Sequence, residues 1–310
     1  MQKWWSLLFG VVLAATFILW LISPAMGWWL PANVSTFGPD VDYLFYVILG
    51  FTGFFFVLTE GLLVYAMYRW AFRPGHKATY VHGNHRLELA WTIVPALILL
   101  FIAFAQVTAW ERIKYQSRFP HPDQILQVGA RQWEWRLRYP ENAATFGQDK
   151  DPDQKAARQW AEVPQIDDLH LVNELHTWFD PDTRKGANVK IFLKTQDVLH
   201  SLYFPNLRLK QDALPGKTIP MWFQATGWNT EFDPATGLCS EPKDKIWELA
   251  CAELCGSRHY AMRGRLFVHK GKADYEAWLK HALELQRSRK PEPSRQQPGS
   301  GDGVAVNTNN

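Results

Sequence analysis

Hydrophobic residues run continuously through much of the first third of the chain and alternate with polar residues in the remainder. Three apolar runs occupy residues 7–22, 43–68 and 89–110. The second and third runs exceed the roughly 20 residues that a helix needs to cross a bilayer. The pattern therefore predicts a membrane-spanning α-helical hairpin, with spans at about 43–68 and 89–110, inside a membrane region of residues 27–115.

The first apolar run is shorter and follows a basic start at Lys3. A short apolar stretch behind a positive charge is typical of a secretory signal peptide, although the segment SPAMG at 23–27 lacks a clean cleavage site. Residues 1–26 are therefore either a signal peptide, which we favour, or an extra N-terminal membrane helix.

Basic residues are distributed unevenly around the apolar runs. The connection at 69–88 holds four Lys or Arg residues, whereas the segment 24–42 holds none. Because cytoplasmic loops of membrane proteins are enriched in Lys and Arg, we expect this connection in the cytoplasm and everything after Trp110 outside. The chain would then be a multi-pass protein of a bacterial-type inner membrane, with its C-terminal domain on the periplasmic side.

From residue 125 onward, short runs rich in Val, Ile, Phe, Trp and Thr alternate with turn clusters such as DPDTRKGAN and LPGKT. Several such strands at regular spacing predict an all-β sandwich or Greek-key barrel over residues 116–287. An amphipathic pattern at 272–287 predicts one helix. The Pro-, Gly- and Ser-rich tail at 288–310 is expected to be disordered.

Charge and cysteine content narrow the possible functions. The net charge is +3 and the Lys and Arg residues are scattered, so no nucleic-acid partner is expected. Three cysteines cannot build a disulfide framework, and the absence of a C-x-x-C-H motif excludes a covalently attached c-type haem.

Two of the three cysteines lie four positions apart in the segment CAELCGSRHYAM. Cys251, Cys255, His259 and Met262 have the spacing C-x3-C-x3-H-x2-M, and His200 closes a predicted strand about fifty residues earlier. One Cys, two His and a weak axial Met form a blue-copper site, and a second thiolate would let both cysteines bridge a pair of ions. The alternatives are a zinc site and buried cysteines without a metal.

Further motifs surround this segment in a characteristic order. The second long membrane run reads LELAWTIVPALILL, and RQWEW, NELH and DVLHSLYFPNLRLKQDALPGKT follow before the cysteine segment. Over residues 28–280 this order resembles subunit II of the haem–copper cytochrome c oxidases. The resemblance implies a cupredoxin-like β-domain that carries a binuclear copper centre, CuA.

The resemblance also implies a role for each residue of the cysteine segment. Cys251 and Cys255 would bridge the two copper ions. His200 and His259 would be terminal ligands, one for each ion. Met262 would be a weak ligand of one copper ion.

Three positions outside the bridging set also match the family. Glu253 would offer its backbone carbonyl to the second copper ion and its side chain to a magnesium ion shared with subunit I. Trp133 in RQWEW matches the exposed ring through which electrons enter, and Glu88 resembles an acid at the cytoplasmic mouth of a proton path. The chain departs from the family at Glu134, where an aromatic residue is usual.

The function implied by the resemblance is that of the electron-accepting subunit of a proton-translocating cytochrome c oxidase. Electrons would come from cytochrome c and pass to haem in subunit I, where O2 is reduced to water. The alternatives are the equivalent subunit of a nitric oxide reductase, a copper-free quinol oxidase subunit II, and a membrane-anchored copper carrier or sensor.

The segment 228–249 is longer than the usual link in this family and contains the third cysteine, Cys239. We expect it to form a surface loop, with a docking element for a partner as the alternative. Cys239 is not expected to bind copper at the CuA centre, because the ligand set is complete without it.

Overall fold

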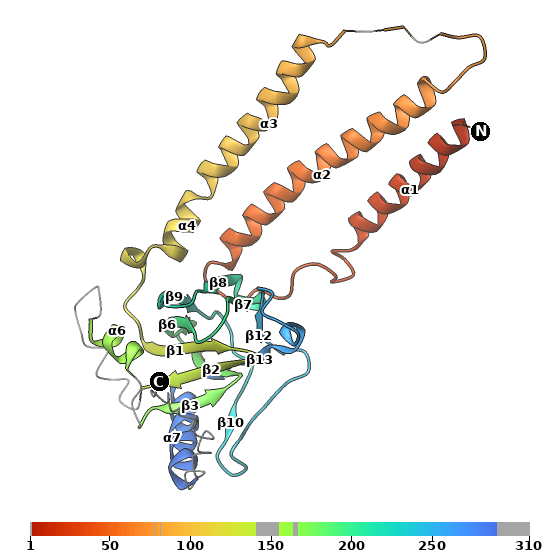
Figure 1. Cartoon of the computed structure of the whole chain (residues 1–310). Helices are drawn as coiled ribbons and strands as arrows, with labels where there is room; N and C mark the ends of the chain where they lie inside the picture. Colours follow the sequence, from red (N-terminus) through yellow and green to blue (C-terminus); the bar gives the residue numbers. More distant parts are fainter. Residues whose placement is uncertain (1, 78, 81, 141–154, 164–166, 290–310) are drawn as a thin grey trace, which may run out of the picture.

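The computed structural model describes residues 2–77, 79–80, 82–140, 155–163 and 167–289, so most of the predicted disordered tail lies outside the described residues. Long helices extend from one side of a β-domain (Figure 1). These helices are α1 (Gln2–Ile22), α2 (Gly38–Arg69), α3 (His85–Ala105) and α4 (Val107–Lys114). α1, α2 and the continuous stretch of α3 and α4 are each long and apolar enough to cross a membrane.

Local sequence signals explain where the long helices begin. Pro39 occupies the first turn of α2, where its missing N–H costs no helical hydrogen bond. The side chain of Asn84 caps α3 by accepting hydrogen bonds from the backbone N–H groups of the next turn. α1 packs along α2, and the Ser6 hydroxyl donates to the carbonyl of Val64 at 2.9 Å. That residues 1–26 are removed as a signal peptide remains a prediction.

The β-domain contains two main sheets and a small hairpin. Its strands are β1 (Gln124–Arg131), β2 (Glu134–Tyr139), β3 (Leu169–Val172), β4 (Glu174–Asp180), β5 (Lys185–Gly186), β6 (Asn188–Thr195), β7 (His200–Phe204), β8 (Leu209–Ala213), β9 (Ile219–Gln224), β10 (Phe232–Asp233), β11 (Leu238–Cys239), β12 (Glu248–Cys251) and β13 (Arg263–Lys270). The shorter helices are α6 (Lys155–Glu162), α7 (Lys272–Ser288) and the 3-10 turns η1 (Gln116–Arg118), η2 (Pro205–Leu207) and η3 (His259–Ala261).

One sheet has the strand order β3-β2-β1-β6-β9 and the other β5-β4-β13-β12-β7-β8. β1 pairs with β6 and β4 with β13 in parallel, whereas the other pairs within these two sheets are antiparallel. Apolar side chains of both sheets form a shared core that includes Trp135, Ile191 and Phe204. This arrangement confirms the predicted order of apolar membrane helices followed by a two-sheet all-β domain. The predicted C-terminal helix is α7.

The segment before α2 is built into the β-domain, which fixes the membrane helices to it. Phe37 is fully buried in the shared core. Arg208, directly before β8, donates to the Asp42 carboxylate at 2.6 Å, and Arg112 of α4 pairs with Asp40 at 2.9 Å. The two ends of the membrane part are therefore both tied to the same end of the domain.

The segment 228–249 is largely exposed between residues 233 and 246, as expected for a surface segment, but it is not an irregular loop. It forms the hairpin β10-β11, which packs against α7. The backbone N–H of Phe232 donates to the Asp274 carboxylate at 3.0 Å, and Asn229 donates to the Leu266 carbonyl at 2.9 Å. The polar and apolar partners offered by α7 and β13 explain why the segment is ordered.

Candidate metal centre

Adjacent strands bring the residues of the cysteine segment together. β7, β12 and β13 are neighbours in one sheet. His200 begins β7, Cys251 ends β12, and Met262 directly precedes β13. The loop between β12 and β13 carries Cys255 and His259, so strand pairing determines where this loop and the two strand ends meet.

Sulfur and nitrogen atoms form a compact chain of contacts. The Sγ atoms of Cys251 and Cys255 lie 3.7 Å apart. His200 Nδ1 lies 3.8 Å from Cys251 Sγ, and His259 Nδ1 lies 3.6 Å from Cys255 Sγ. Each imidazole is therefore the neighbour of a different thiol. Met262 Sδ lies 3.9 Å from Cys255 Sγ.

These distances fit shared metal ions and do not fit a disulfide. A disulfide needs an S–S separation of about 2.05 Å. Metal–sulfur bonds of about 2.3 Å and metal–imidazole bonds of about 2.0 Å place two donors of one ion at most about 4.6 Å apart. All the separations above lie below that limit. Thiolate, thioether and imidazole together favour copper over hard cations.

The carbonyl of Glu253 lies 3.2 Å from Cys251 Sγ, at the opposite end of the cluster from Met262. The side chain of Glu253 is exposed. Burial, together with the neighbouring Cys251 thiol, raises the pKa of Cys255 to about 12. The metal-free thiol is therefore protonated at neutral pH, and a bound metal ion must displace that proton.

A carboxylate that sequence reasoning did not assign to the site orients His200. Asp197 Oδ1 lies 2.8 Å from His200 Nε2, so that His200 Nε2 donates and Nδ1 is left free toward Cys251. Asp197 Oδ2 in turn accepts from the backbone N–H of Gln132 at 2.7 Å. The only feature of the sequence that could have predicted this role is that Asp197 lies three residues before His200.

The segment before His200 is a turn rather than the end of a strand. Asp197 Oδ1 accepts from the backbone N–H of Val198 at 2.7 Å, and the Thr195 hydroxyl donates to the Val198 carbonyl at 2.8 Å. Short polar side chains favour such turns because they satisfy nearby backbone groups. His200 therefore begins β7, a correction to the sequence prediction.

Trp133 lies against the cysteine loop, in the turn between β1 and β2. A Cβ atom added at Gly256 would meet Trp133 Cζ2 at 3.2 Å and Gln132 Nε2 at 2.9 Å. Gln132 also donates to the carbonyl of Cys255 at 2.8 Å. The indole is half-buried rather than fully exposed, because the glycine lets loop and ring pack closely.

The unusual residue Glu134 is held between two arginines. Arg131 and Arg136 both donate to Glu134 Oε1 at 2.7 Å. Partial burial alone would raise the pKa of Glu134, but these hydrogen bonds and positive charges lower it overall. Glu134 is therefore an ionised, paired side chain beside Trp133 rather than a free acid.

The remaining predicted residue, Glu88, lies far from this cluster. It occupies the first turn of α3, at the end of the helix that points away from the β-domain (Figure 1). Its side chain is half exposed, and its carboxylate lies 4.0 Å from His85. The structure thus brings the sulfur and imidazole residues together with Trp133 and leaves Glu88 at the opposite end of the membrane part.

Apolar side chains surround the cysteine loop on the outside. Leu254 is 79% exposed and Tyr260 is 77% exposed. Val198 and Leu199, beside His200, are also exposed. Exposed apolar groups that gather at one site commonly mark a surface for a partner protein.

Comparison with known proteins gives a consistent family relationship. Residues 23–108 match the family model described as cytochrome c oxidase subunit II, transmembrane domain. This match includes α2 and α3 and begins directly after α1 ends.

Curated relatives extend the similarity over most of the chain. The chain is 24% identical over 279 residues to the alternative cytochrome c oxidase subunit 2 of Bradyrhizobium diazoefficiens, covering 88% of this chain and 90% of the relative. It is 28% identical over 300 residues to cytochrome c oxidase subunit 2 of Thermostichus vulcanus, covering 88% and 84%. The periplasmic domain of subunit II of cytochrome oxidase from Bradyrhizobium japonicum aligns with 54% of this chain and 98% of its own, at 18% identity and a TM-score of 0.37.

Proposed function

This chain belongs to the cytochrome c oxidase subunit II family, and we propose that it is the subunit that accepts electrons from cytochrome c for a respiratory terminal oxidase. The observation that carries the proposal is the pairing of thiols and imidazoles. Two thiols lie 3.7 Å apart, and each has its own imidazole within 3.8 Å. Such a set suits two ions bridged by two shared thiolates.

The residues of the cysteine loop, together with His200, would supply bridging, terminal and weak ligands to two copper ions. Cys251 and Cys255 would bridge, and His200 and His259 would complete one ion each. Met262 and the Glu253 carbonyl would be weak ligands at opposite ends. A copper pair held in this way supplies one-electron redox chemistry when it is bound.

The protein's own contribution is to hold these ligands nearly fixed. His200 is fully buried, stands edge-on to Trp135, and is oriented by Asp197. Met262 and Cys255 are buried. Ligands locked by packing and by hydrogen bonds move little when charge changes, which favours fast electron transfer.

The outer face of the loop supports electron transfer from a docked protein. Trp133 packs beside Gly256, one residue from Cys255, and would carry electrons from the surface to the bridging thiolate. The exposed Leu254 and Tyr260 would contact the donor or subunit I. The exposed Glu253 carboxylate would supply one ligand to a magnesium ion shared with subunit I, since magnesium takes few protein carboxylates and keeps other ligands.

The charge pattern supports a domain on the outer face of a bacterial inner membrane. The α2–α3 connection lies at the end of the helices far from the β-domain (Figure 1). The four Lys and Arg residues of 69–88, in that connection and the adjoining helix ends, favour the cytoplasm, which would put the domain in the periplasm. Glu88 would then face the cytoplasm, where it would suit the uptake of protons toward subunit I.

The proposal is tested by mixing reduced cytochrome c with the copper-loaded full-length chain in detergent and following haem absorbance in a stopped-flow instrument. We expect rapid oxidation of cytochrome c by the chain. The Cys251→Ser/Cys255→Ser variant should not react, whereas the matched control Cys239→Ser should react normally. Firm copper binding without any oxidation of cytochrome c would contradict electron transfer and favour a copper carrier.

A further inference from the structure

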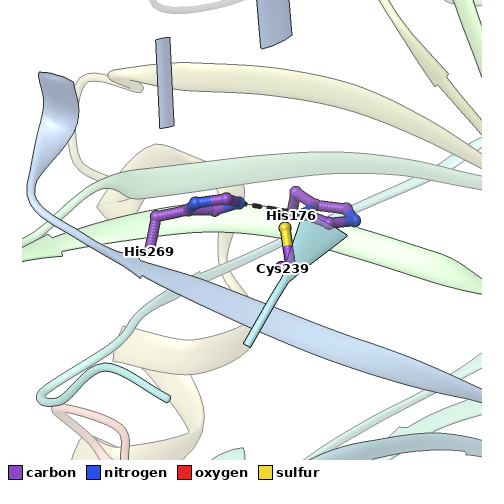
Figure 2. Close-up of side chains that lie close together, drawn as sticks. All are labelled: His176, Cys239 and His269. Carbon is purple, nitrogen blue, oxygen red and sulfur yellow. Dashed lines mark hydrogen bonds between the residues drawn. The ribbon is translucent and has the colours of Figure 1, made fainter. Parts of the chain in front are cut away.

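A second group of metal-binding side chains lies in the β-domain, away from the cysteine loop. His176 of β4, Cys239 of β11 and His269 of β13 each place a nitrogen or sulfur atom within 4.8 Å of the others. Figure 2 shows the sulfur of Cys239 beside the contact between the two imidazole rings. His269 is seven residues further along the chain than Met262, which is about 23 Å of strand.

The fold assembles this cluster from three distant segments. β4 and β13 are paired neighbours, and the parallel register places Phe267 opposite His176. Cys239 arrives on the hairpin β10-β11, which the Phe232–Asp274 and Asn229–Leu266 hydrogen bonds hold in place. The inserted segment therefore delivers the thiol to a pair of histidines.

His269 is oriented as a metal-binding imidazole. Its Nδ1 lies 2.7 Å from Asp274 Oδ2, so Nδ1 carries the proton and donates to the carboxylate. Its Nε2, which then has a free lone pair, lies 3.0 Å from His176 Nδ1. A carboxylate on the far nitrogen is the usual partner of a metal-bound histidine, because it fixes the tautomer and raises the basicity of the ligand.

His176 is the least satisfied member when no metal is bound. Because the His269 lone pair faces it, His176 Nδ1 must hold the proton, and Nε2 is then unprotonated. Nε2 is buried and has no hydrogen-bond partner among the described residues. A metal ion at Nδ1 would move the proton to Nε2, which lies 3.8 Å from the Glu174 carboxylate. Each imidazole would then have a carboxylate near its protonated nitrogen, at 2.7 Å for His269 and at 3.8 Å for His176.

The rings are also held rigidly. His176 is stacked between Trp278 at 3.7 Å and Phe267 at 4.5 Å, measured between ring centroids. Both histidines are almost completely buried. Such packing keeps the donors close to the same geometry with or without an ion, so binding requires little rearrangement.

We propose that His176, His269 and Cys239 form a second, mononuclear metal site for one ion with affinity for imidazole and thiolate, copper or zinc. Two imidazoles and one thiolate form trigonal copper sites and also serve zinc with one further ligand. Donors of one such ion lie about 3.3–3.5 Å apart when bond lengths are about 2.0 Å to nitrogen and 2.3 Å to sulfur. The nitrogens, 3.0 Å apart, would separate slightly, and the sulfur, within 4.8 Å of both, would move toward the ion by up to about 1.3 Å.

The test uses the full-length chain in detergent, in a Cys251→Ser/Cys255→Ser background that removes the bridging thiolates. The chain is stripped with a chelator, loaded with zinc or copper, desalted and analysed by elemental mass spectrometry. We expect one ion per chain in the background variant and at least a tenfold loss of affinity after the additional change Cys239→Ser. Cobalt(II) loading should give a thiolate charge-transfer band that requires Cys239.

A second readout guards against a misfolded variant. Thermal unfolding of the β-domain without metal should be closely similar with and without Cys239→Ser, and only the chain with Cys239 should be stabilised by added metal. The metal that binds with the higher affinity, zinc or copper, identifies the ion that the site prefers. No metal retained and no cobalt–thiolate band in a folded chain would overturn the proposal and leave the cluster a hydrogen-bonded core. The background lacks the CuA thiolates, so the result does not depend on the proposed electron-transfer function.

Discussion

The cysteine loop and the His176–Cys239–His269 cluster offer the same kinds of donor atoms in opposite settings. Four of the five side-chain donors in the first lie within twelve residues, in a loop whose Leu254 and Tyr260 are exposed. The donors of the second come from three segments, one of them the β10-β11 hairpin, and Trp278 of α7 packs against both of its histidines. We infer that donors held beneath an exposed apolar loop suit electron exchange with a partner, whereas a half-buried thiol beside two buried imidazoles suits one firmly held ion.

The largest expected effect is at the bridging thiolates. Changing Cys251 to Ser removes a shared ligand and should lower the rate of cytochrome c oxidation by the assembled oxidase at least about a hundredfold, or about 2.7 kcal/mol. The Cys239→Ser variant should keep more than half of the activity. Equal losses in the two variants, measured by oxygen consumption, would erase the functional distinction between the clusters.

The candidate ligands of the cysteine loop could be predicted from the sequence because all but one of its side-chain donors share a short segment. Cys251 to Met262 carry their spacing in the chain itself, and His200 stands in a recognisable motif. The contact of Asp197 with the Gln132 N–H and the half-burial of Trp133 against Gly256 depend on where the β1–β2 turn lies, which no local spacing encodes.

The second cluster was missed for the same physical reason. His176 and His269 become neighbours only through the parallel pairing of β4 with β13. The segment around Cys239 has the composition of a surface loop, and its order comes from tertiary contacts such as Phe232 with Asp274. Alternating hydrophobic patterns predicted the strands but not their order across the sheet.

The carboxylates behind the histidines allow the two clusters to be compared directly. Asp197→Asn should weaken copper binding at the cysteine loop by about 10–100-fold, because the partner of His200 loses its charge. Asp274→Asn should do the same for zinc or copper at the second cluster and leave the cysteine loop unaffected. Competition titrations with a chelator of known affinity measure both. A change in both sites from either variant would mean that the sites are coupled.

A smaller effect is expected at Trp133. Trp133→Phe should retain the copper content of the cysteine loop but lower kcat/KM for cytochrome c about tenfold, or about 1.4 kcal/mol. Stopped-flow oxidation of cytochrome c provides the measurement. Trp228→Phe, a change of the same size near the β10-β11 hairpin, is the matched control. A normal rate with Trp133→Phe would show that electrons reach the loop by another route.

The smallest effect concerns two buried tyrosines beside the second cluster. The Tyr139 hydroxyl accepts from the backbone N–H of His176 at 2.7 Å, and the Tyr275 ring centroid lies 5.8 Å from that of His269. Burial raises the pKa of Tyr139 and of Tyr275 above the ordinary value of about 10. The unfolded chain therefore loses these protons first as pH rises, so the stabilising contribution is present below about pH 10 and is lost above it, by up to about 1.4 kcal/mol per pH unit for each tyrosine. Tyr275→Phe should make the alkaline loss of stability less steep.

Denaturant unfolding of the full-length chain in detergent at a series of pH values measures this dependence. Tyr260→Phe, at an exposed position of the cysteine loop, is the control and should unfold with the parental pH dependence. If Tyr275→Phe leaves the slope of unfolding free energy against pH unchanged, the region around Tyr275 opens before the domain unfolds.

The central claim is that Cys251 and Cys255 hold two copper ions that share one electron. The most direct measurement is a copper count combined with an EPR spectrum of the full-length chain in a Cys239→Ser background, which removes the second cluster. The account predicts two copper ions per chain and a seven-line hyperfine pattern, both lost on Cys251→Ser. A single copper ion with a four-line pattern would contradict it.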